Sequence, residues 1–264
     1  MRIVLLAAEN LPCVVATSGF LEKHRSEVAA VCLLPSVPAA LSPGKSRSWR
    51  FFLRLPAEVL FYKFLETPLH NAVRRLLGRP SVASVAAARG IPLLRLEDPN
   101  SPRALELLRG LSPDAIFNLS PSILKAPVLG LPRAGCFNFH GGLLPRYRGV
   151  ANYFWFLIDG SPVAGASVHR MLPEIDAGDV VAEASFPVSP EDTVHSINFK
   201  TSALGPALLG ETLRRLRDGD LRSKPQDASE ARTRGFPSRE DVRRLRRSGR
   251  RLFSWKDLWA TLRY

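Results

Sequence analysis

Short apolar runs alternate with stretches of helical periodicity through the first half of the chain. We predict buried strands from these runs, at residues 3–8, 28–34, 115–119 and 136–139. Runs of this length without polar alternation are typical of parallel strands covered on both faces, and the helical stretches between them suit crossover helices. The pattern therefore predicts an α/β fold with a doubly wound, mainly parallel sheet.

The ends of these strands indicate where a ligand would bind. In doubly wound sheets the binding crevice lies beyond the carboxyl ends of the strands. Asn10, Ser120 and His140 follow three of the predicted strands. We therefore expect the functional site near these residues.

The second half of the chain predicts two more strands and a long helix. An alternating run at residues 165–171 and a second run at residues 180–184 read as strands. A helix is expected over residues 202–217, and Gly219 would end it. This helix would close the main domain.

A helical insertion is expected at about residues 45–79 of a main domain that spans residues 1–218. It holds eight basic and two acidic residues. Two helices that begin at prolines are predicted in it, at residues 56–66 and 68–77, with Thr67 as the candidate N-cap between them. Its aromatic residues are Trp49, Phe51, Phe52, Phe61, Tyr62 and Phe64. The insertion would either cap the sheet or form a basic, aromatic surface for a lipid interface, a partner subunit or an acidic acceptor.

The chain is strongly basic, and much of the excess charge lies in an extension at residues 219–264. The 264 residues carry a formal net charge of +13, and residues 231–264 hold eleven Lys or Arg against three Asp or Glu. A capping box at residues 238–241 predicts a short helix with Val242 and Leu245 on one face. This basic extension is either a solvated surface element or a contact for nucleic acid, phosphate or an acidic surface.

Cysteine usage and hydropathy indicate the compartment. The three cysteines are odd in number and widely spaced, which argues against a disulfide framework and suits a reducing compartment. The first apolar run stops at Glu9 without a signal-peptide cleavage site, and no run approaches the ~18 apolar residues of a membrane helix. We therefore expect a cytoplasmic protein with no transmembrane segment, in which peripheral membrane contact stays open.

The densest group of polar and glycine residues follows the fourth predicted strand. Asn138 and His140 are two residues apart, so in an extended strand both side chains project to the same face. The Gly141-Gly142 pair after them lets the backbone approach a ligand closely, and Arg146 and Arg148 add positive charge. One strand end thus presents a carboxamide and an imidazole together.

Asp176 supplies a carboxylate from a glycine-containing loop about thirty residues later. A carboxylate beside an imidazole raises the pKa of the histidine and fixes its tautomer, which suits proton transfer near neutral pH. We therefore predict Asn138, His140 and Asp176 as a catalytic set, with the amide donating to a developing oxyanion. A metal site built from His140, His169 and Asp176 is not expected, because no further ligand motif accompanies it.

These residues and their neighbours closely resemble the formyltransferase family that uses 10-formyltetrahydrofolate, which includes the glycinamide ribonucleotide, methionyl-tRNA and amino-sugar formyltransferases. The resemblance covers residues 1 to about 218 and is strongest over residues 114–218. It rests on paired motifs in this order and spacing: Asn138-x-His140-x-x-Leu143-Leu144-Pro145-x-Tyr147-Arg148-Gly149, Trp155, Gly165-x-Ser167-x-His169 and Ile175-Asp176-x-Gly178-Asp179.

The resemblance implies a Rossmann-like catalytic domain and a role for each matching residue. Asn138, His140 and Asp176 would be the catalytic trio, supporting attack of a primary amine on the formyl carbon of 10-formyltetrahydrofolate without a metal. Two loops would hold the pterin ring of this donor, and their residues are Ser122, Ile123, Leu124, Leu172 and Ile175. Residues expected to contact the acceptor are Asn10, Gly142, Arg148 and His169, although His169 is as readily a packing residue.

The sequence departs from the family near the acceptor. Family members often carry Ser at the position of Gly142 and Pro at that of Asn152. The phosphate-cradling loop of the glycinamide ribonucleotide enzymes is replaced here by a loop in which Glu9 would repel a phosphate and Pro12 removes an amide donor. These departures disfavour the purine-pathway substrate.

The sequence leaves several hypotheses open for the identity of the acceptor and for the type of reaction. A small amine, such as an amino sugar on a nucleotide or lipid carrier, suits the chain best, because fewer than fifty residues follow Gly219 and a C-terminal barrel of the methionyl-tRNA enzymes does not fit there. A methionyl-tRNA formyltransferase-like enzyme is the alternative. A third hypothesis is a hydrolase that releases formate from the same folate. A fourth is a non-enzymatic binding protein whose basic tail contacts nucleic acid.

Overall fold

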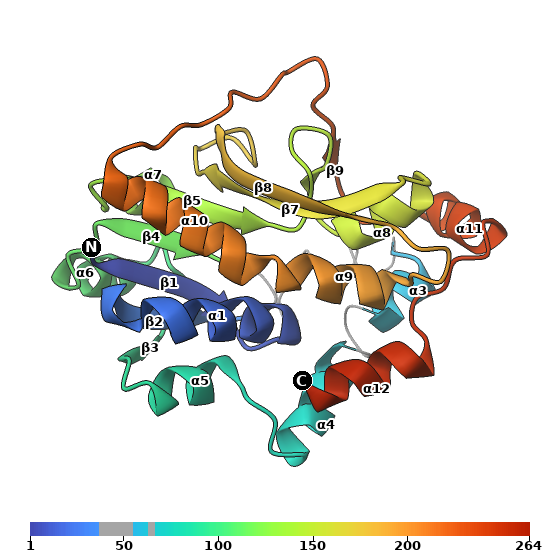
Figure 1. Ribbon diagram of the computed structural model, residues 1–264, viewed down its shortest axis with the longest axis horizontal. Coiled ribbons are helices and arrows are strands. Elements are labelled where there is room, and N and C mark those ends of the chain that lie inside the picture. Colours follow the sequence, from blue (N-terminus) through green and yellow to red (C-terminus); the bar gives the residue numbers. More distant parts are fainter. Residues whose placement is uncertain (37–54, 63–66) are drawn as a thin grey trace.

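The fold is a seven-stranded, mainly parallel sheet with helices on both faces (Figure 1). The computed structural model describes residues 1–36, 55–62 and 67–264. The strand order is β3-β2-β1-β4-β5-β7-β8, in which β7 and β8 run antiparallel to their neighbours. The strands are β1 (Ile3–Ala8), β2 (Val28–Leu34), β3 (Leu93–Arg95), β4 (Ala115–Asn118), β5 (Gly135–His140), β7 (Val163–Arg170) and β8 (Val180–Pro187). The predicted doubly wound α/β fold is confirmed.

Two hydrophobic clusters enclose the sheet, which explains why its central strands have no polar alternation. Along β1, Ile3 and Leu5 belong to one cluster, whereas Val4 and Leu6 belong to the other. The first cluster is completed by α1 (Leu11–His24), α5 (Val82–Ala88) and α10 (Gly205–Asp218), and the second by α6 (Pro102–Gly110) and α7 (Ala126–Leu129). Burial on both faces therefore requires the continuous apolar runs seen in the sequence.

The long helix expected over residues 202–217 is divided in two. The structure places α9 at Val194–Ala203 and α10 at Gly205–Asp218, and the two follow one another almost in line (Figure 1). Pro206 lies in the first turn of α10, where a residue without an N–H is tolerated. Gly219 ends α10 in the left-handed conformation, with φ of +67°, as predicted.

The predicted helical insertion is described in part. Short α3 (Ala57–Leu60) and α4 (Thr67–Leu76) lie where two helices were expected, with Thr67 as the first residue of α4 instead of the cap before it. Tyr62 is buried in a third hydrophobic cluster, which favours packing over exposure for this aromatic residue. Residues 37–54 and 63–66, which hold Trp49, Phe51, Phe52 and Phe64, lie outside the described residues.

The C-terminal extension packs on the main sheet domain through a small second sheet and two helices. Strand β9 (Thr233–Arg234) pairs with β6 (Arg148–Gly149), next to α8 (Asn152–Ile158). Helix α11 (Arg239–Arg247) begins at the predicted capping box and buries Val242 and Leu245 in the third cluster, and α12 (Trp255–Arg263) follows it. A single turn of 3₁₀-helix, η1 (Arg25–Glu27), follows α1. In the described ranges, no helix is both long enough and apolar enough to cross a membrane.

Candidate active site

A row of polar side chains crosses three adjacent strands at the carboxyl edge of the sheet. The register pairs Asn118 of β4 with Asn138 of β5, and Asn138 with His169 of β7. The Asn118 amide donates to the Asn138 oxygen at 3.1 Å, and Asn138 Nδ2 lies 3.2 Å from His169 Nε2. The sheet register therefore fixes the orientation of the Asn138 carboxamide.

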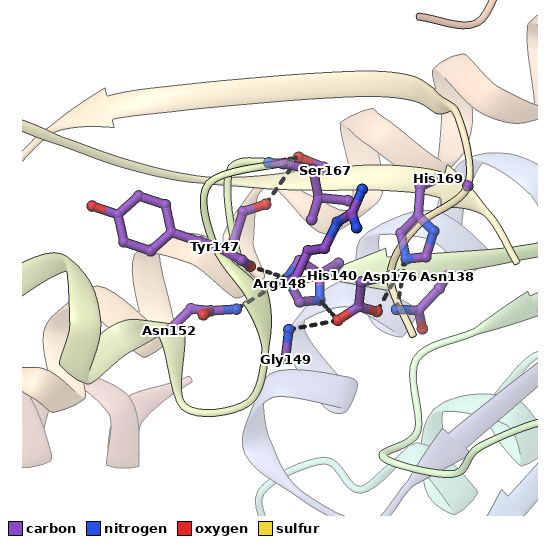
Figure 2. Close-up of polar contacts among 12 residues, drawn as sticks. Asn138, His140, Tyr147, Arg148, Gly149, Asn152, Ser167, His169 and Asp176 are labelled. Carbon is purple, nitrogen blue, oxygen red and sulfur yellow. Dashed lines mark hydrogen bonds and ion pairs between the residues drawn. The ribbon is translucent and has the colours of Figure 1, made fainter. Parts of the chain in front are cut away.

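Asp176 reaches this row from the loop between β7 and β8. Figure 2 shows its carboxylate between the rings of His140 and His169, with Oδ2 3.5 Å from His140 Nδ1 and Oδ1 3.4 Å from His169 Nε2. The Gly149 backbone N–H donates to Oδ2 at 2.7 Å. Asp176 has a left-handed backbone with φ of +51°, a conformation uncommon for residues other than glycine and often found at functional sites. The structure thus brings the predicted trio together.

The His140 ring is buried and held from its other side. Its Nε2 lies 2.6 Å from the Tyr147 carbonyl oxygen, so Nε2 carries a hydrogen and donates it to that oxygen. Nδ1 is then the nitrogen that can accept a proton, and it faces Asp176. Burial lowers the pKa of His140 and outweighs the opposing attraction of Asp176. His140 is therefore neutral at pH 7 and ready to act as a base.

The Asp176 carboxylate stays ionised. Burial works against its charge, but the neighbouring His169 and His140 rings and the Gly149 N–H outweigh burial and hold the pKa of Asp176 at about 2. A fixed negative charge beside a neutral imidazole stabilises that imidazole once it takes up a proton. The pair can therefore move a proton near neutral pH. Among the described residues, no cluster of three His, Cys, Asp or Glu side chains is arranged to hold a metal ion.

The residues expected to hold the pterin ring have unequal exposure. Ile123, Leu172 and Ile175 are exposed, at 65%, 46% and 54% of their surface, and so offer apolar area to a flat ring. The Ser122 carbonyl accepts from Asn118 at 3.4 Å, so this loop is tied to the polar row. Leu124 instead packs in the core, and only its backbone could face a ligand.

The residues expected to contact the acceptor lie around the same edge. The Asn10 side chain caps α1 by accepting from the Cys13 N–H, and Arg148 donates to Gln226 at 2.9 Å. Gly142 is enclosed, because a Cβ there would lie 2.6 Å from the Tyr147 carbonyl oxygen and 2.8 Å from His140 Nε2. His169 contacts both Asn138 and Asp176, and so belongs to the polar row.

Two residues of the site were not among those predicted. Asn152 places its carboxamide 3.0 Å from His140 Nε2 and 2.6 Å from the Cβ position of Gly142, so the space that a side chain at 142 would need is already filled. Gln226 donates to the carbonyl oxygens of Asp176 and Gly178, which braces the loop. Gly142 and Asn152 both differ from the residues that are frequent in the family, and this paired difference could have indicated the contact of Asn152 with His140. No local sequence pattern marks Gln226.

The chain is similar to known proteins over part of its length. Residues 95–213 match the family model described as formyl transferase. A methionyl-tRNA formyltransferase of Citrifermentans bemidjiense is 38% identical over 149 residues, which are 56% of this chain and 47% of that protein. The chain therefore spans about half the length of this curated relative.

Solved structures share the fold. Glycinamide ribonucleotide transformylase 1 from Symbiobacterium toebii aligns with a TM-score of 0.59 at 18% identity, covering 86% of this chain and 94% of that one. An N-formyltransferase from Helicobacter canadensis aligns with a TM-score of 0.56 at 17% identity, covering 91% and 72%. The trio lies inside residues 95–213, the segment that matches the formyl transferase family model.

Proposed function

We propose that the protein transfers the formyl group of 10-formyltetrahydrofolate to a primary amine of a small acceptor. The observation that carries this proposal is the convergence of Asn138, His140 and Asp176 from two separate segments, with oxygen-to-nitrogen distances of 3.5 Å or less linking the carboxylate to both histidines of the site. The match of residues 95–213 to the formyl transferase family model supports the same reaction. The exposed apolar side chains of Ile123 and Ile175 fit a flat donor ring.

Each member of the trio has a distinct part in this reaction. His169 Nε2 lies 3.2 Å from Asn138 Nδ2 and 3.4 Å from Asp176 Oδ1, so the ring holds both groups in place. Asn138 Nδ2 can donate a hydrogen to the formyl oxygen as negative charge develops on it. His140 Nδ1 takes the proton that the attacking amine loses, and Asp176 stabilises the resulting imidazolium. The tetrahedral intermediate then collapses by breaking the bond between the formyl carbon and N10 of the folate, and the imidazolium returns the proton to N10 as tetrahydrofolate leaves.

The comparisons support a nucleotide-linked amino sugar as the acceptor. The Helicobacter canadensis N-formyltransferase structure contains folinic acid and dTDP-3-aminofucose. An acceptor of this kind presents a primary amine on a sugar that carries phosphates. Methionyl-tRNA is the second candidate acceptor, because the Citrifermentans bemidjiense relative is a methionyl-tRNA formyltransferase.

Turnover assays with defined acceptors test this function. The full chain is incubated with 10-formyltetrahydrofolate and either a nucleotide-linked amino sugar, methionyl-tRNA or no amine, and both tetrahydrofolate and the formylated amine are measured. Amine-dependent turnover with a formylated product supports the proposal. Formate release that needs no amine would show a hydrolase instead, and donor binding without any turnover would show a binding protein.

A further inference from the structure

We propose that a hollow beside the start of α1 binds a phosphate group of the acceptor through Arg74, Arg75 and Arg79. The assignment to an acceptor rests on the proposed function, whereas the phosphate site itself does not. The hollow opens to solvent and lies between α1, α4 and the start of α5. Asn10 and Asn71 also line it.

Arg74 is the strongest indication of an anionic ligand. Its side chain is only 3% exposed, and its Nε has no hydrogen-bond partner. Its Nη2 makes a long contact of 3.4 Å to the Pro80 carbonyl oxygen. Burying a guanidinium without a counter-charge is costly, and an anion in the hollow would remove that cost.

The cations of the hollow are not neutralised within the described part of the chain. There, no carboxylate lies within 4 Å of a charged nitrogen of Arg74, Arg75 or Arg79. Burial, together with the nearby charge of Arg79, lowers the pKa of Arg74, while the Tyr264 hydroxyl acts in the opposite direction. The charges of Arg74 and Arg79 thus repel each other, and an anion in the hollow would offset that repulsion.

Glu9 lines the same hollow, but its charge is already engaged. Its two carboxylate oxygens accept from the Val82 and Ala83 backbone N–H groups at 3.1 and 3.0 Å, at the start of α5. The sequence suggested that Glu9 would repel a phosphate. Its carboxylate keeps its negative charge and is held by these N–H groups, while the three arginines of α4 and the residues after it supply the larger, positive charge.

A chain of contacts links the hollow to the proposed active site. Asn10 caps α1 through the Cys13 N–H, and Cys13 Sγ donates to the Leu119 carbonyl oxygen at 3.2 Å. Leu119 follows Asn118, which donates to Asn138. Both sites therefore lie along the carboxyl edge of the sheet, the edge at which doubly wound sheets bind their ligands. The ligand class that fits is a primary amine that also carries a phosphate or diphosphate.

Binding of inorganic pyrophosphate to the full chain, measured by calorimetry at low salt, tests the site. The variant Arg75→Gln/Arg79→Gln removes two exposed cations of the hollow, and Arg243→Gln/Arg247→Gln removes two exposed cations of α11 as the matched control. We expect the first pair to weaken binding about tenfold or more, because hydrogen bonds to charged groups are lost, and the control to leave it within about twofold. The proposed site would be overturned if both variants weakened pyrophosphate binding equally, or if Arg75→Gln/Arg79→Gln bound pyrophosphate as tightly as the wild type.

Two further ligands identify the source of the phosphate. If the site serves the acceptor, a nucleoside diphosphate binds more tightly than inorganic phosphate and loses affinity in Arg75→Gln/Arg79→Gln. Equal affinity for the nucleoside diphosphate and for inorganic phosphate would show a site for free phosphate and would reject its assignment to the acceptor. Binding of 5-formyltetrahydrofolate should be unchanged, and its loss would show that the arginines hold donor carboxylates. Because no turnover is needed, failure of formyl transfer would leave the site result standing.

Discussion

His140 is the residue whose surroundings decide the chemistry. A carbonyl oxygen fixes its hydrogen on Nε2, Asn152 fills the space beside that nitrogen that a side chain at Gly142 would need, and Asp176 faces Nδ1. The sequence could predict Asn138 and His140, because their spacing of two puts them on one strand face. It could not predict the Tyr147 carbonyl contact or the tautomer, because both depend on how the turn after Gly142 folds back.

Crowding at Gly142 predicts that a methyl group there impairs the reaction. In Gly142→Ala the new Cβ would press on the Tyr147 oxygen and His140 Nε2, and we expect turnover to fall about tenfold or more as the ring is displaced. Gly141→Ala is the control, because its Cβ would meet only Thr201 Cγ2 at an ordinary 3.5 Å. Steady-state kinetics of both variants checks this. Equal loss in the two variants would contradict the role given to this space.

The lowered pKa of His140 predicts the pH dependence of turnover. His140 must be neutral to accept a proton, and burial places its pKa below the ordinary 6.5, so it stays neutral until the solution is more acidic than that value. We expect kcat to hold between pH 8 and 6.5 and to decline only at lower pH. A kcat profile whose acid limb has its midpoint above 6.5 would show that His140 is not the base, or that it is not buried as described.

At the scale of elements, the extension holds the active-site loops in place. Strand β9 pairs with β6, whose Gly149 N–H binds Asp176, and Gln226 binds the backbone of the Asp176 loop. The capping box of α11 was visible in the sequence at Ser238, since caps are local patterns. The β6–β9 pairing was not, because it joins two-residue strands more than eighty positions apart.

Arg234 anchors this contact and predicts a loss of stability when it is removed. It forms an ion pair with Asp159 at 2.7 Å and covers the Trp155 ring at 4.6 Å, and both charged groups are less than a fifth exposed. We expect Arg234→Ala to lower the free energy of unfolding by about 3 kcal/mol, because it leaves a largely buried carboxylate unpaired. The exposed neighbour Arg232→Ala should change it by less than about 0.5 kcal/mol.

Urea unfolding of these two variants and the wild type measures the difference. If Arg234→Ala were as stable as Arg232→Ala, the extension would not be held through this ion pair. Turnover of Arg234→Ala should also fall, because β9 positions the strand that carries Gly149.

At the scale of the whole molecule, the hydrophobic pattern predicted the sheet, and the motif spacing predicted the trio. Neither could predict which residues surround the acceptor. Buried parallel strands leave uninterrupted apolar runs, so β1 and β2 were predicted at their observed bounds. The arginine hollow joins residues of α4 to Asn10 across some sixty positions, and only the folded chain brings them together. Contact of the basic extension with nucleic acid or an acidic surface stays a prediction.

The central claim is that His140 and Asp176 act as one unit in formyl transfer, and a double-mutant cycle tests it most directly. Turnover of 10-formyltetrahydrofolate with an active amine is measured for His140→Gln, Asp176→Asn and the double variant, with donor binding as the control. We predict that each single change lowers kcat about 10²-fold and that the double change costs little more, because the carboxylate acts through the imidazole. Near-normal kcat in either single variant, or losses that multiply to about 10⁴-fold, would contradict the account.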